Sequence, residues 1–414
     1  MMAGKAKTGR RTPVRGAGRS RPQTAGVRSR GEVRRNPAAA GRGGVRSSAS
    51  VRRPHAMDYS IVFLVIFLVG FGLVMVYSTS SYRGSLYMDD AAYWLKRQAF
   101  FAVLGIAAMF FVARIDYHFW KSKKWMLPVY YWGTILLLIF TLIFAAVSHG
   151  SRRWLNIGPL SFQPSEAAKV SLILIFAIYI SRNAKKLRTW KGIVKCFALA
   201  VPIIVVVGIE NLSTCIILMA ITVIMIFVAS DKWKPFFAIG GVGIAGIAVL
   251  LLTQGYRVER IKIWLNPEQY ETGLQTMQGL YAIGSGGLFG KGLGQSMQKM
   301  GFLPETHNDM IFSIICEELG LFGAISILII YFVLLWRFMV VALNAADLYG
   351  SMIVVGTIAH LGIQVFINIG VVTNTIPNTG IPLPFISYGG TSLCFLLIEM
   401  GLVLSVSRYM RIKE

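Results

Sequence analysis

Long apolar segments recur along the chain from residue 57 onward, and most charged positions fall between them. Each segment approaches the ~20 residues that an α-helix needs to cross a bilayer. We expect ten transmembrane helices, over 59–78, 98–113, 125–147, 164–180, 193–208, 213–229, 235–252, 310–335, 351–372 and 387–406. The pattern predicts an all-α polytopic membrane protein in which residues 57–414 form one transmembrane domain.

Composition supports the same class. The 414 residues are 55% hydrophobic and 14% charged, and their mean hydropathy is +0.60, which excludes an ordinary soluble domain. The cysteines all fall in predicted helices, at Cys196, Cys215, Cys316 and Cys394. They are therefore expected to be packing residues rather than a disulfide framework or a metal motif.

Residues 1–56 form a different segment, rich in Arg, Gly, Ala and Ser. It carries fifteen Lys/Arg against a single acid, Glu32, and too few apolar residues to build a core. We expect a disordered basic tail. A polybasic segment directly before a transmembrane helix favours contact with anionic lipid in the cytoplasmic leaflet, and we do not expect nucleic acid as a partner.

The charges between the predicted helices indicate the orientation. Basic residues gather at 121–124, 182–191, 232–234 and 408–413, on the same side as the tail. By the positive-inside rule both termini are cytoplasmic. Four connections then lie outside, at 79–97, 148–163, 253–308 and 373–386. The 253–308 connection carries aromatic residues among its glycines, which favours a folded lid.

Asp309 stands at the outer mouth of the predicted eighth helix, within the sequence FLPETHNDMIFSIICEELG (302–320). An ionised carboxylate costs up to roughly 2.5–3.5 kcal/mol at full membrane depth, so it persists mainly where it faces a polar cavity. The alternative is that Asp309 caps the following helix, which would stabilise it by about 1 kcal/mol. The residue pattern alone leaves both interpretations open.

Two more polar groups lie in the second outer connection and just after it. Glu166 and Lys169 share one face at the start of the fourth helix, where they either form a structural ion pair or hold a substrate. Arg152 and Arg153 precede Trp154 and offer planar donors suited to a diphosphate. Anchoring to lipid headgroups is the competing explanation.

The long outer connection contains GSGGLFGKGLGQS (284–296), in which glycines allow close backbone approach and Lys291 and Gln295 suit an anion. It is not a nucleotide-binding P-loop, because Lys291 is followed by Gly292 instead of Ser or Thr. His307 lies beside Asp309 and either tunes it, touches a substrate, or is a polar surface residue.

Five strings together resemble the SEDS family (FtsW/RodA/SpoVE): GLVMVYSTSS (72–81), SRRWLNIGPLSFQPSEAAKV (151–170), GGLFGKGLGQS (286–296), residues 302–320, and TGIPLPFISYGGTSL (379–393). The GLVMVYS start and the basic tail are most similar to the cell-division FtsW type. Two positions depart from the pattern. The segment 377–380 lacks a Lys that some division-type members carry, and the turn 210–214 lacks the family's usual Asp.

The resemblance implies a peptidoglycan glycosyltransferase that polymerises lipid II into glycan strands at the outer face of the bacterial plasma membrane. Implied partners are the nascent strand, a class B penicillin-binding protein (a transpeptidase) and other divisome proteins. Asp309 matches the family's catalytic aspartate and would be the general base. One base suffices, because a pyrophosphate leaves without protonation when cations neutralise it.

Substrate contacts are expected from Arg152, Arg153, Glu166, Lys169, Lys291, Gln295, His307 and Ser387. Any divalent cation, such as Mg²⁺ or Mn²⁺, would rest on pyrophosphate and carboxylate oxygens, because the sequence carries no metal motif. Two other functions remain open: a lipid II flippase, and a non-catalytic scaffold that recruits a transpeptidase.

Overall fold

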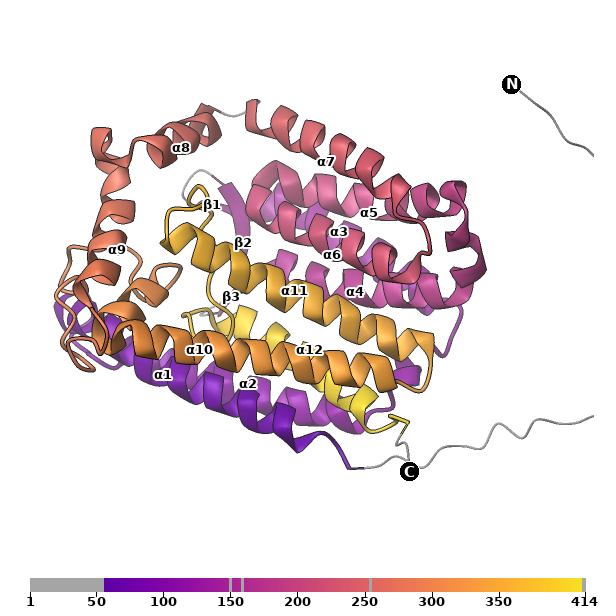
Figure 1. Ribbon diagram of the computed structural model, residues 1–414, viewed down its shortest axis with the longest axis horizontal. Helices are drawn as coiled ribbons and strands as arrows, with labels where there is room; N and C mark the ends of the chain where they lie inside the picture. The colour runs from indigo at the N-terminus through magenta and orange to yellow at the C-terminus, as the bar shows by residue number, and fades with distance from the viewer. Residues whose placement is uncertain (1–55, 149–150, 158–159, 253–254, 412–414) are drawn as a thin grey trace, which may run out of the picture. The chain divides into compact units, whose positions relative to one another are not determined.

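The computed structural model describes residues 56–148, 151–157, 160–252 and 255–411. These residues belong to one compact unit that spans 52–414. The predicted basic tail, residues 1–56, lies almost entirely outside the described residues. Within the compact unit, most helices run lengthwise beside one another (Figure 1).

Each predicted segment contains a helix, although the helices that begin at Tyr59 and Ile311 each continue nine residues past the predicted end. The helices are α1 (Tyr59–Tyr87), α2 (Tyr93–Arg114), α3 (Met126–Phe144), α4 (Pro164–Asn183), α5 (Trp190–Glu210), α6 (Leu212–Ala229), α7 (Lys234–Leu252), α8 (Gly255–Leu265), α9 (Leu274–Ser285), α10 (Ile311–Asn344), α11 (Leu348–Val372) and α12 (Gly390–Ser407). In the described part of the chain, nine of these are long and apolar enough to cross a membrane. The one predicted segment outside these nine, 235–252, also forms a helix, α7. The polytopic helical fold is confirmed.

The ten predicted helices include neither α8 nor α9, and a small antiparallel sheet was also not predicted. The predicted third helix ends at Phe144, three residues early, and the chain continues as β1 (Ala146–Ser148), β2 (Ser151–Ile157) and β3 (Leu160–Phe162). Leu155 pairs with Phe162, and Ile157 pairs with Leu160. The strands pair with one another through backbone hydrogen bonds, so this connection is not an irregular loop.

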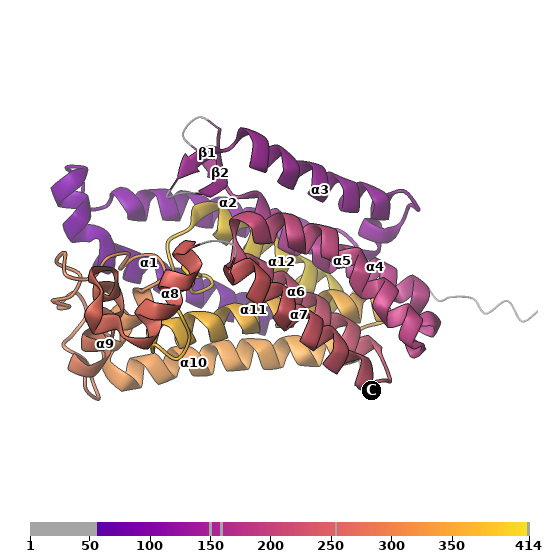
Figure 2. The ribbon, with the colours of Figure 1, turned by 90° about the horizontal axis from the view of Figure 1, so that it is seen from above.

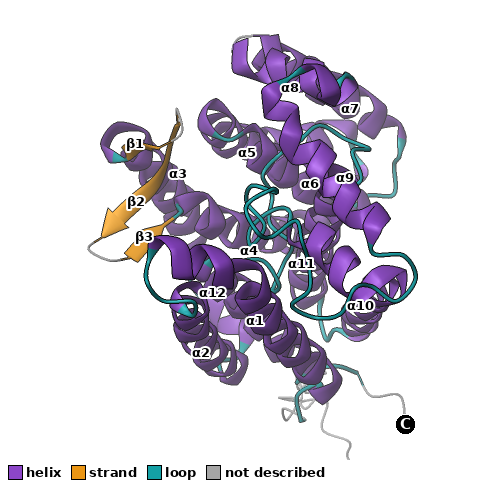
Figure 3. Cartoon of the chain, turned by 90° about the vertical axis from the view of Figure 1, so that its left-hand side faces the viewer, coloured by secondary structure: helices purple, strands orange, loops and turns teal. Residues whose placement is uncertain are grey.

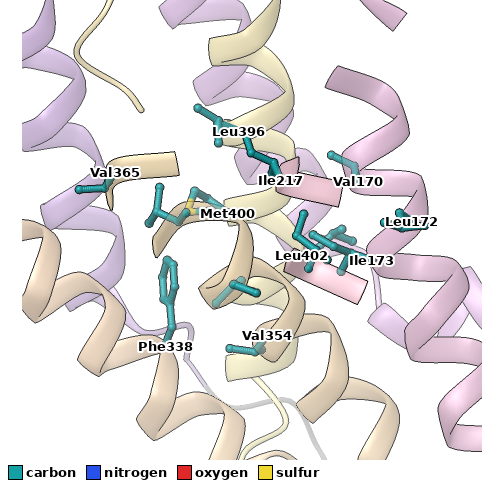
Figure 4. Packing of buried hydrophobic residues seen from close by; sticks show 14 of the residues in the cluster. Val170, Leu172, Ile173, Ile217, Phe338, Val354, Val365, Leu396, Met400 and Leu402 are labelled. Carbon is teal, nitrogen blue, oxygen red and sulfur yellow. The ribbon is translucent and has the colours of Figure 1, made fainter. Parts of the chain in front are cut away.

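Two helices occupy the centre of the bundle. About three quarters of the apolar stretch of α4, and of that of α11, is buried inside the protein. Most of the apolar stretch of α3 is exposed. α11 packs against α4, α6, α10 and α12, and the end-on view shows it surrounded by other helices (Figure 3). The core contains Ile173 from α4, Ile217 from α6, Val354 from α11 and Met400 from α12 (Figure 4).

The start of α1 and the end of α12 lie at the same end of the bundle. The Asp58 amide donates to Ser407 Oγ at 3.1 Å, and the Asp58 carboxylate pairs with Arg337 at 2.5 Å. The first and last described segments are therefore on one side. That this side is cytoplasmic stays a prediction.

The connection between α7 and α10 contains α8, two short 3-10 turns (Pro267–Gln269 and Glu271–Gly273) and α9. α8 and α9 lie at one end of the bundle (Figure 2). After α9 the chain forms a glycine-rich segment, residues 286–296, which we call the glycine loop.

The glycine loop docks into a break in α10. Gly320 has φ 68°, ψ −169°, so the helical hydrogen bonds are interrupted there. Four backbone hydrogen bonds join the two segments: Lys291 N to Glu317 O (3.0 Å), Gly292 N to Glu318 O (2.9 Å), Leu321 N to Gly287 O (2.9 Å) and Phe322 N to Leu288 O (3.0 Å). The loop thus supplies bonds that α10 loses at its break.

Glycine is required on both sides of this contact. A Cβ on Gly320 would lie 2.4 Å from Gly290 N, and one on Gly290 would lie 2.2 Å from Glu318 O. Both residues also have positive φ, which L side chains rarely adopt. The glycines predicted to approach an anion instead approach the backbone of α10.

Gly320→Ala should lower the thermal unfolding temperature in detergent. The positive φ alone costs roughly 1–3 kcal/mol for a non-glycine residue, and the Cβ would also overlap the loop backbone. Gly284→Ala is the matched control, because its position in α9 is exposed and open, with no heavy atom within 4 Å of the added Cβ. Equal unfolding temperatures for the two variants would contradict this account of the α10 break.

Candidate functional site

Asp309 is buried immediately before α10 and does not cap it. The residue at the cap position is Met310, and α10 has no side-chain cap hydrogen bond. Asp309 Oδ1 has no hydrogen-bond partner among the described residues. The capping interpretation is therefore wrong, and the carboxylate retains a free acceptor in a buried setting.

The surroundings of Asp309 favour its protonated form. Burial, and secondarily the negative charge of Glu305, raise the pKa of the Asp309 carboxyl to about 7, although backbone amides and the positive charge of Arg260 oppose the shift. Removal of a carboxylate from water penalises its charged form. A carboxyl with a pKa near neutrality is suited to accept a proton at physiological pH.

His307 lies inside the protein, so the alternative of a polar surface residue is wrong. Its ring centroid is 5.2 Å from that of Trp94 and 5.6 Å from that of Tyr388. The Tyr388 amide donates to the His307 carbonyl at 2.8 Å. Burial lowers the pKa of His307 to about 4, so the ring is neutral at pH 7. It packs the segment before Asp309 against α2 and the loop before α12.

A buried side chain from α11 fixes the backbone at Asp309. The Asn368 amide nitrogen donates to the Asp309 carbonyl and to the Ile381 carbonyl, at 2.9 Å each. One helical turn away, the Gln364 amide donates to the Pro382 carbonyl at 3.0 Å. The two amides therefore hold the Asp309 segment and the 381–382 segment at one place.

His360, Gln364 and Asn368 follow one another at intervals of four and so share one face of α11. In the described structure each has one buried atom without a hydrogen-bond partner: His360 Nε2, Gln364 Oε1 and Asn368 Oδ1. The other His360 nitrogen, Nδ1, lies 2.8 Å from Glu399 Oε2 in α12. This polar face was not predicted, although polar residues at helical spacing in an apolar segment are a recognisable signal in the sequence.

Lys291 is part of an ion-pair cluster beneath the glycine loop. Its ammonium lies 2.7 Å from Glu317 Oε1, and Lys299 lies 2.9 Å from Glu318 Oε1. Ser78 in α1 donates to Glu318 at 2.8 Å, and Ser296 donates to Glu317. We call Glu317, Glu318, Lys291 and Lys299 the carboxylate clamp. The clamp pairs each of the two buried glutamates with a lysine. Gln295, by contrast, is exposed on the loop.

Glu166 and Lys169 form an ion pair, which is one of the two interpretations that their spacing in the sequence allows. Their side chains are buried and 2.8 Å apart, and Ser392 Oγ in α12 donates to Glu166 at 2.8 Å. This pair connects α4 to α12. Its predicted contact with substrate stays a prediction.

The remaining predicted residues lie in two other segments. The Ser387 hydroxyl accepts a 2.8 Å hydrogen bond from the Leu383 amide, and the Ser387 carbonyl accepts one from Gln98 at 3.2 Å. Ser387 therefore shapes the loop before α12. Arg152 and Arg153 belong to β2, but their side chains fall outside the described residues.

No group of three or more His, Cys, Asp or Glu residues within the described ranges could hold a metal ion. The chemistry at this site consists of one buried acid, a neutral histidine and amide groups that fix the backbone. Fold and site together define an integral membrane protein with a buried, unpaired carboxylate oxygen at one end of its helix bundle.

Comparison with known proteins identifies the family. The FtsW/RodA/SpoVE model, described as "Cell cycle protein", matches residues 59–412. The chain belongs to this family, which confirms the predicted SEDS membership. It is 41% identical over 358 residues to stage V sporulation protein E of Bacillus subtilis, covering 86% of this chain and 98% of that protein.

Two further similarities agree. A probable peptidoglycan glycosyltransferase FtsW of a Geobacter species is 36% identical, covering 87% of this chain and 99% of the relative. A chain from a peptidoglycan synthase complex that coordinates polymerization and crosslinking has a TM-score of 0.68 and 28% identity, over 85% of this chain and 98% of that one. The rod shape determining protein RodA of Thermus thermophilus has a TM-score of 0.62 and 27% identity, over 86% and 99%. The names of these proteins refer to different processes, including sporulation and the determination of rod shape. The assignment of this chain to the cell-division type therefore stays a prediction.

The clamp gives a prediction about stability. Lys299→Met should destabilise the protein by roughly 3–5 kcal/mol, because Glu318 would be left as a buried charge without its cation. Adding Glu318→Gln should recover much of this loss. Thermal unfolding in detergent of the two single variants and the double variant measures the coupling.

Lys96→Met provides the control for that cycle. Lys96 forms an exposed ion pair with Asp90 at 2.8 Å, and exposed pairs contribute little to stability. If Lys299→Met unfolds at the same temperature as Lys96→Met, the clamp does not hold the loop as described.

Proposed function

We propose that this chain is a peptidoglycan glycosyltransferase that polymerises lipid II into glycan strands at the outer face of the bacterial plasma membrane. The observation that carries the proposal is the buried Asp309 carboxyl, whose pKa of about 7 suits a general base. The family membership and the FtsW relatives, named as probable peptidoglycan glycosyltransferases, support it.

In the proposed reaction, Asp309 takes the proton from the 4-hydroxyl of the acceptor sugar. The hydroxyl oxygen then bonds to the anomeric carbon of the donor, and the bond from that carbon to the lipid pyrophosphate breaks with its electron pair. Attack from the opposite face inverts the α linkage to β. The pyrophosphate leaves as an anion, and the proton on Asp309 passes to water before the next cycle.

The leaving pyrophosphate needs positive charge more than it needs a proton. Lys169 and Lys291 are already paired with carboxylates, so we assign this role to Arg152 and Arg153, whose guanidinium groups suit a diphosphate. Substrate contacts by Glu166, Lys169, Lys291, Gln295, His307 and Ser387 stay predictions. A divalent cation such as Mg²⁺ or Mn²⁺, resting on pyrophosphate and carboxylate oxygens, stays a prediction.

We propose a class B penicillin-binding transpeptidase and other divisome proteins as partners. The structural similarity to a chain from a peptidoglycan synthase complex supports assembly with a crosslinking enzyme. Both termini would be cytoplasmic, with anionic lipid at the basic tail. Neither a flippase nor a non-catalytic scaffold needs a base aligned on a sugar hydroxyl at the outer face, which is the role proposed for Asp309.

Asp309→Asn should abolish glycan-strand formation by purified protein supplied with lipid II in detergent. The amide keeps the volume of the side chain but cannot accept the proton, and loss of a general base typically costs 10²–10⁴-fold in rate, about 3–5 kcal/mol. Glu268→Gln, an exposed acid, serves as the control for charge removal. Polymer formation at the wild-type rate by folded Asp309→Asn protein would overturn the proposal.

The polymerisation rate should also depend on pH near neutrality. Since the Asp309 pKa is raised to about 7, its reactive carboxylate form is lost as pH falls, and kcat/KM should decrease tenfold per unit below about pH 7. His307 stays neutral over this range because its pKa is about 4.

The control for the pH profile is His118→Gln. The pKa of His118 is raised, chiefly by its hydrogen bond to Asp347, so this residue could titrate in the same range from outside the site. The decrease below pH 7 should persist in His118→Gln protein. Its disappearance would assign the titration to His118 and contradict the role given to Asp309.

A further inference from the structure

A pocket opens between α8, α9 and the connection from α11 to α12, and nothing in the proposed mechanism uses it. It encloses about 260 Å³. Its walls include the polar residues Arg260, Thr272, Gln275, Asn374 and Asn378 and the indole of Trp264. We call it the α8–α9 pocket.

The walls of the pocket are held by hydrogen bonds across the three elements. Arg260 donates to the Asn378 carbonyl at 3.0 Å, and Trp264 Nε1 donates to the Asn374 carbonyl at 3.0 Å. The Asn378 amide donates to Gln275 Oε1 at 3.1 Å. The pocket is therefore preorganised, which reduces the entropy lost when a ligand binds.

Hydrogen-bonding capacity remains unused there. Among the described residues, the buried Nε2 atom of the wall residue Gln275 has no hydrogen-bond partner. Buried polar atoms are normally satisfied by protein or by a ligand. Amides, a hydroxyl, a guanidinium and one aromatic ring match the hydroxyl and acetamido groups of a sugar, and the volume suits a single ring.

The pocket lies next to Asp309. The Gly380 amide donates to the side chain of Asn378 at 3.1 Å, and a Cβ on Gly380 would be 3.9 Å from Asp309 Oδ2. The positive charge of Arg260 also acts on the Asp309 carboxyl. A ligand in the pocket would therefore be separated from the base only by the 378–380 turn.

We propose that the α8–α9 pocket binds one N-acetylhexosamine ring of the acceptor glycan, adjacent to the ring whose hydroxyl faces Asp309. This inference rests on the proposed function, because it assigns a subsite of that same reaction. In this arrangement the connection from α11 to α12 forms a wall between two neighbouring sugar positions. Its amide side chains position the acceptor without touching the reacting atoms.

Two variants test the pocket by steady-state kinetics with lipid II in detergent. Gln275→Ala removes the unpaired amide donor, and it also removes the Oε1 that accepts from Asn378. It should therefore raise KM at least about fivefold, the effect of one lost hydrogen bond to the ligand. Thr272→Trp fills the pocket from an exposed wall position and should raise KM further. In both variants kcat should stay within about twofold of wild type, because Asp309 is not altered.

Gln269→Ala is the matched control, since Gln269 is exposed on the neighbouring 3-10 turn and does not line the pocket. It should leave KM unchanged, and all three variants should remain folded at the assay temperature, as thermal unfolding in detergent would show. Wild-type KM values for both Gln275→Ala and Thr272→Trp would overturn the subsite.

The same assay separates this inference from the proposed function. If wild-type protein forms no polymer, or if Asp309→Asn protein forms it normally, the proposed function fails. If wild type is active, Asp309→Asn is inactive and the pocket variants behave as wild type, only the subsite fails.

A second substrate separates a sugar ligand from a peptide ligand. With a lipid-linked disaccharide that lacks its stem peptide, the pocket variants should show the same rise in KM. Loss of that rise would assign the pocket to the peptide and overturn the sugar assignment.

Discussion

The break of α10 at Gly320 is possible within an apolar bundle only because the glycine loop restores the missing hydrogen bonds. Backbone groups in a membrane interior must be satisfied internally, since water is not available to them. Lys291 N and Gly292 N reach the carbonyls of Glu317 and Glu318, while the amides after Gly320 bond to the loop. The loop and the broken helix thus form a single structural unit.

The two glutamates before the break add a second constraint. A buried carboxylate is tolerated when a cation and hydrogen-bond donors surround it. Glu317 and Glu318 receive Lys291 and Lys299 from the loop, and Ser78 brings in α1. The chain from 302 to 309 starts from this fixed point, and Thr306 ties it to the Thr79 carbonyl at 3.2 Å. The position of Asp309 follows from contacts on both sides of it in the sequence.

The site is completed by segments far from Asp309 in the sequence. Asn368 bonds to the backbone at Asp309 and at Ile381, and Tyr388 bonds to the backbone of His307. The loop between α11 and α12 therefore faces Asp309 on one side, while its Asn374–Asn378 part lines the α8–α9 pocket on the other. A shift of this loop would change the surroundings of Asp309, the proposed base, together with the proposed sugar position. That coupling gives a physical reason for building both from one connection.

The sequence by itself determined the helical membrane fold, the family and the candidate base. Length and hydropathy decide whether a segment can span a bilayer, and a lone acid at a helix mouth is unusual enough to be recognised. The sequence could not decide the partners of Lys291, Glu317, Glu318 and His307, because these lie on elements that meet only in the folded bundle. In the tertiary structure, Lys291 belongs to an ion pair and His307 lies in the interior. The Asp309 side chain forms no capping hydrogen bond with α10. Local patterns encode which helices form, whereas burial and pairing depend on contacts between distant segments.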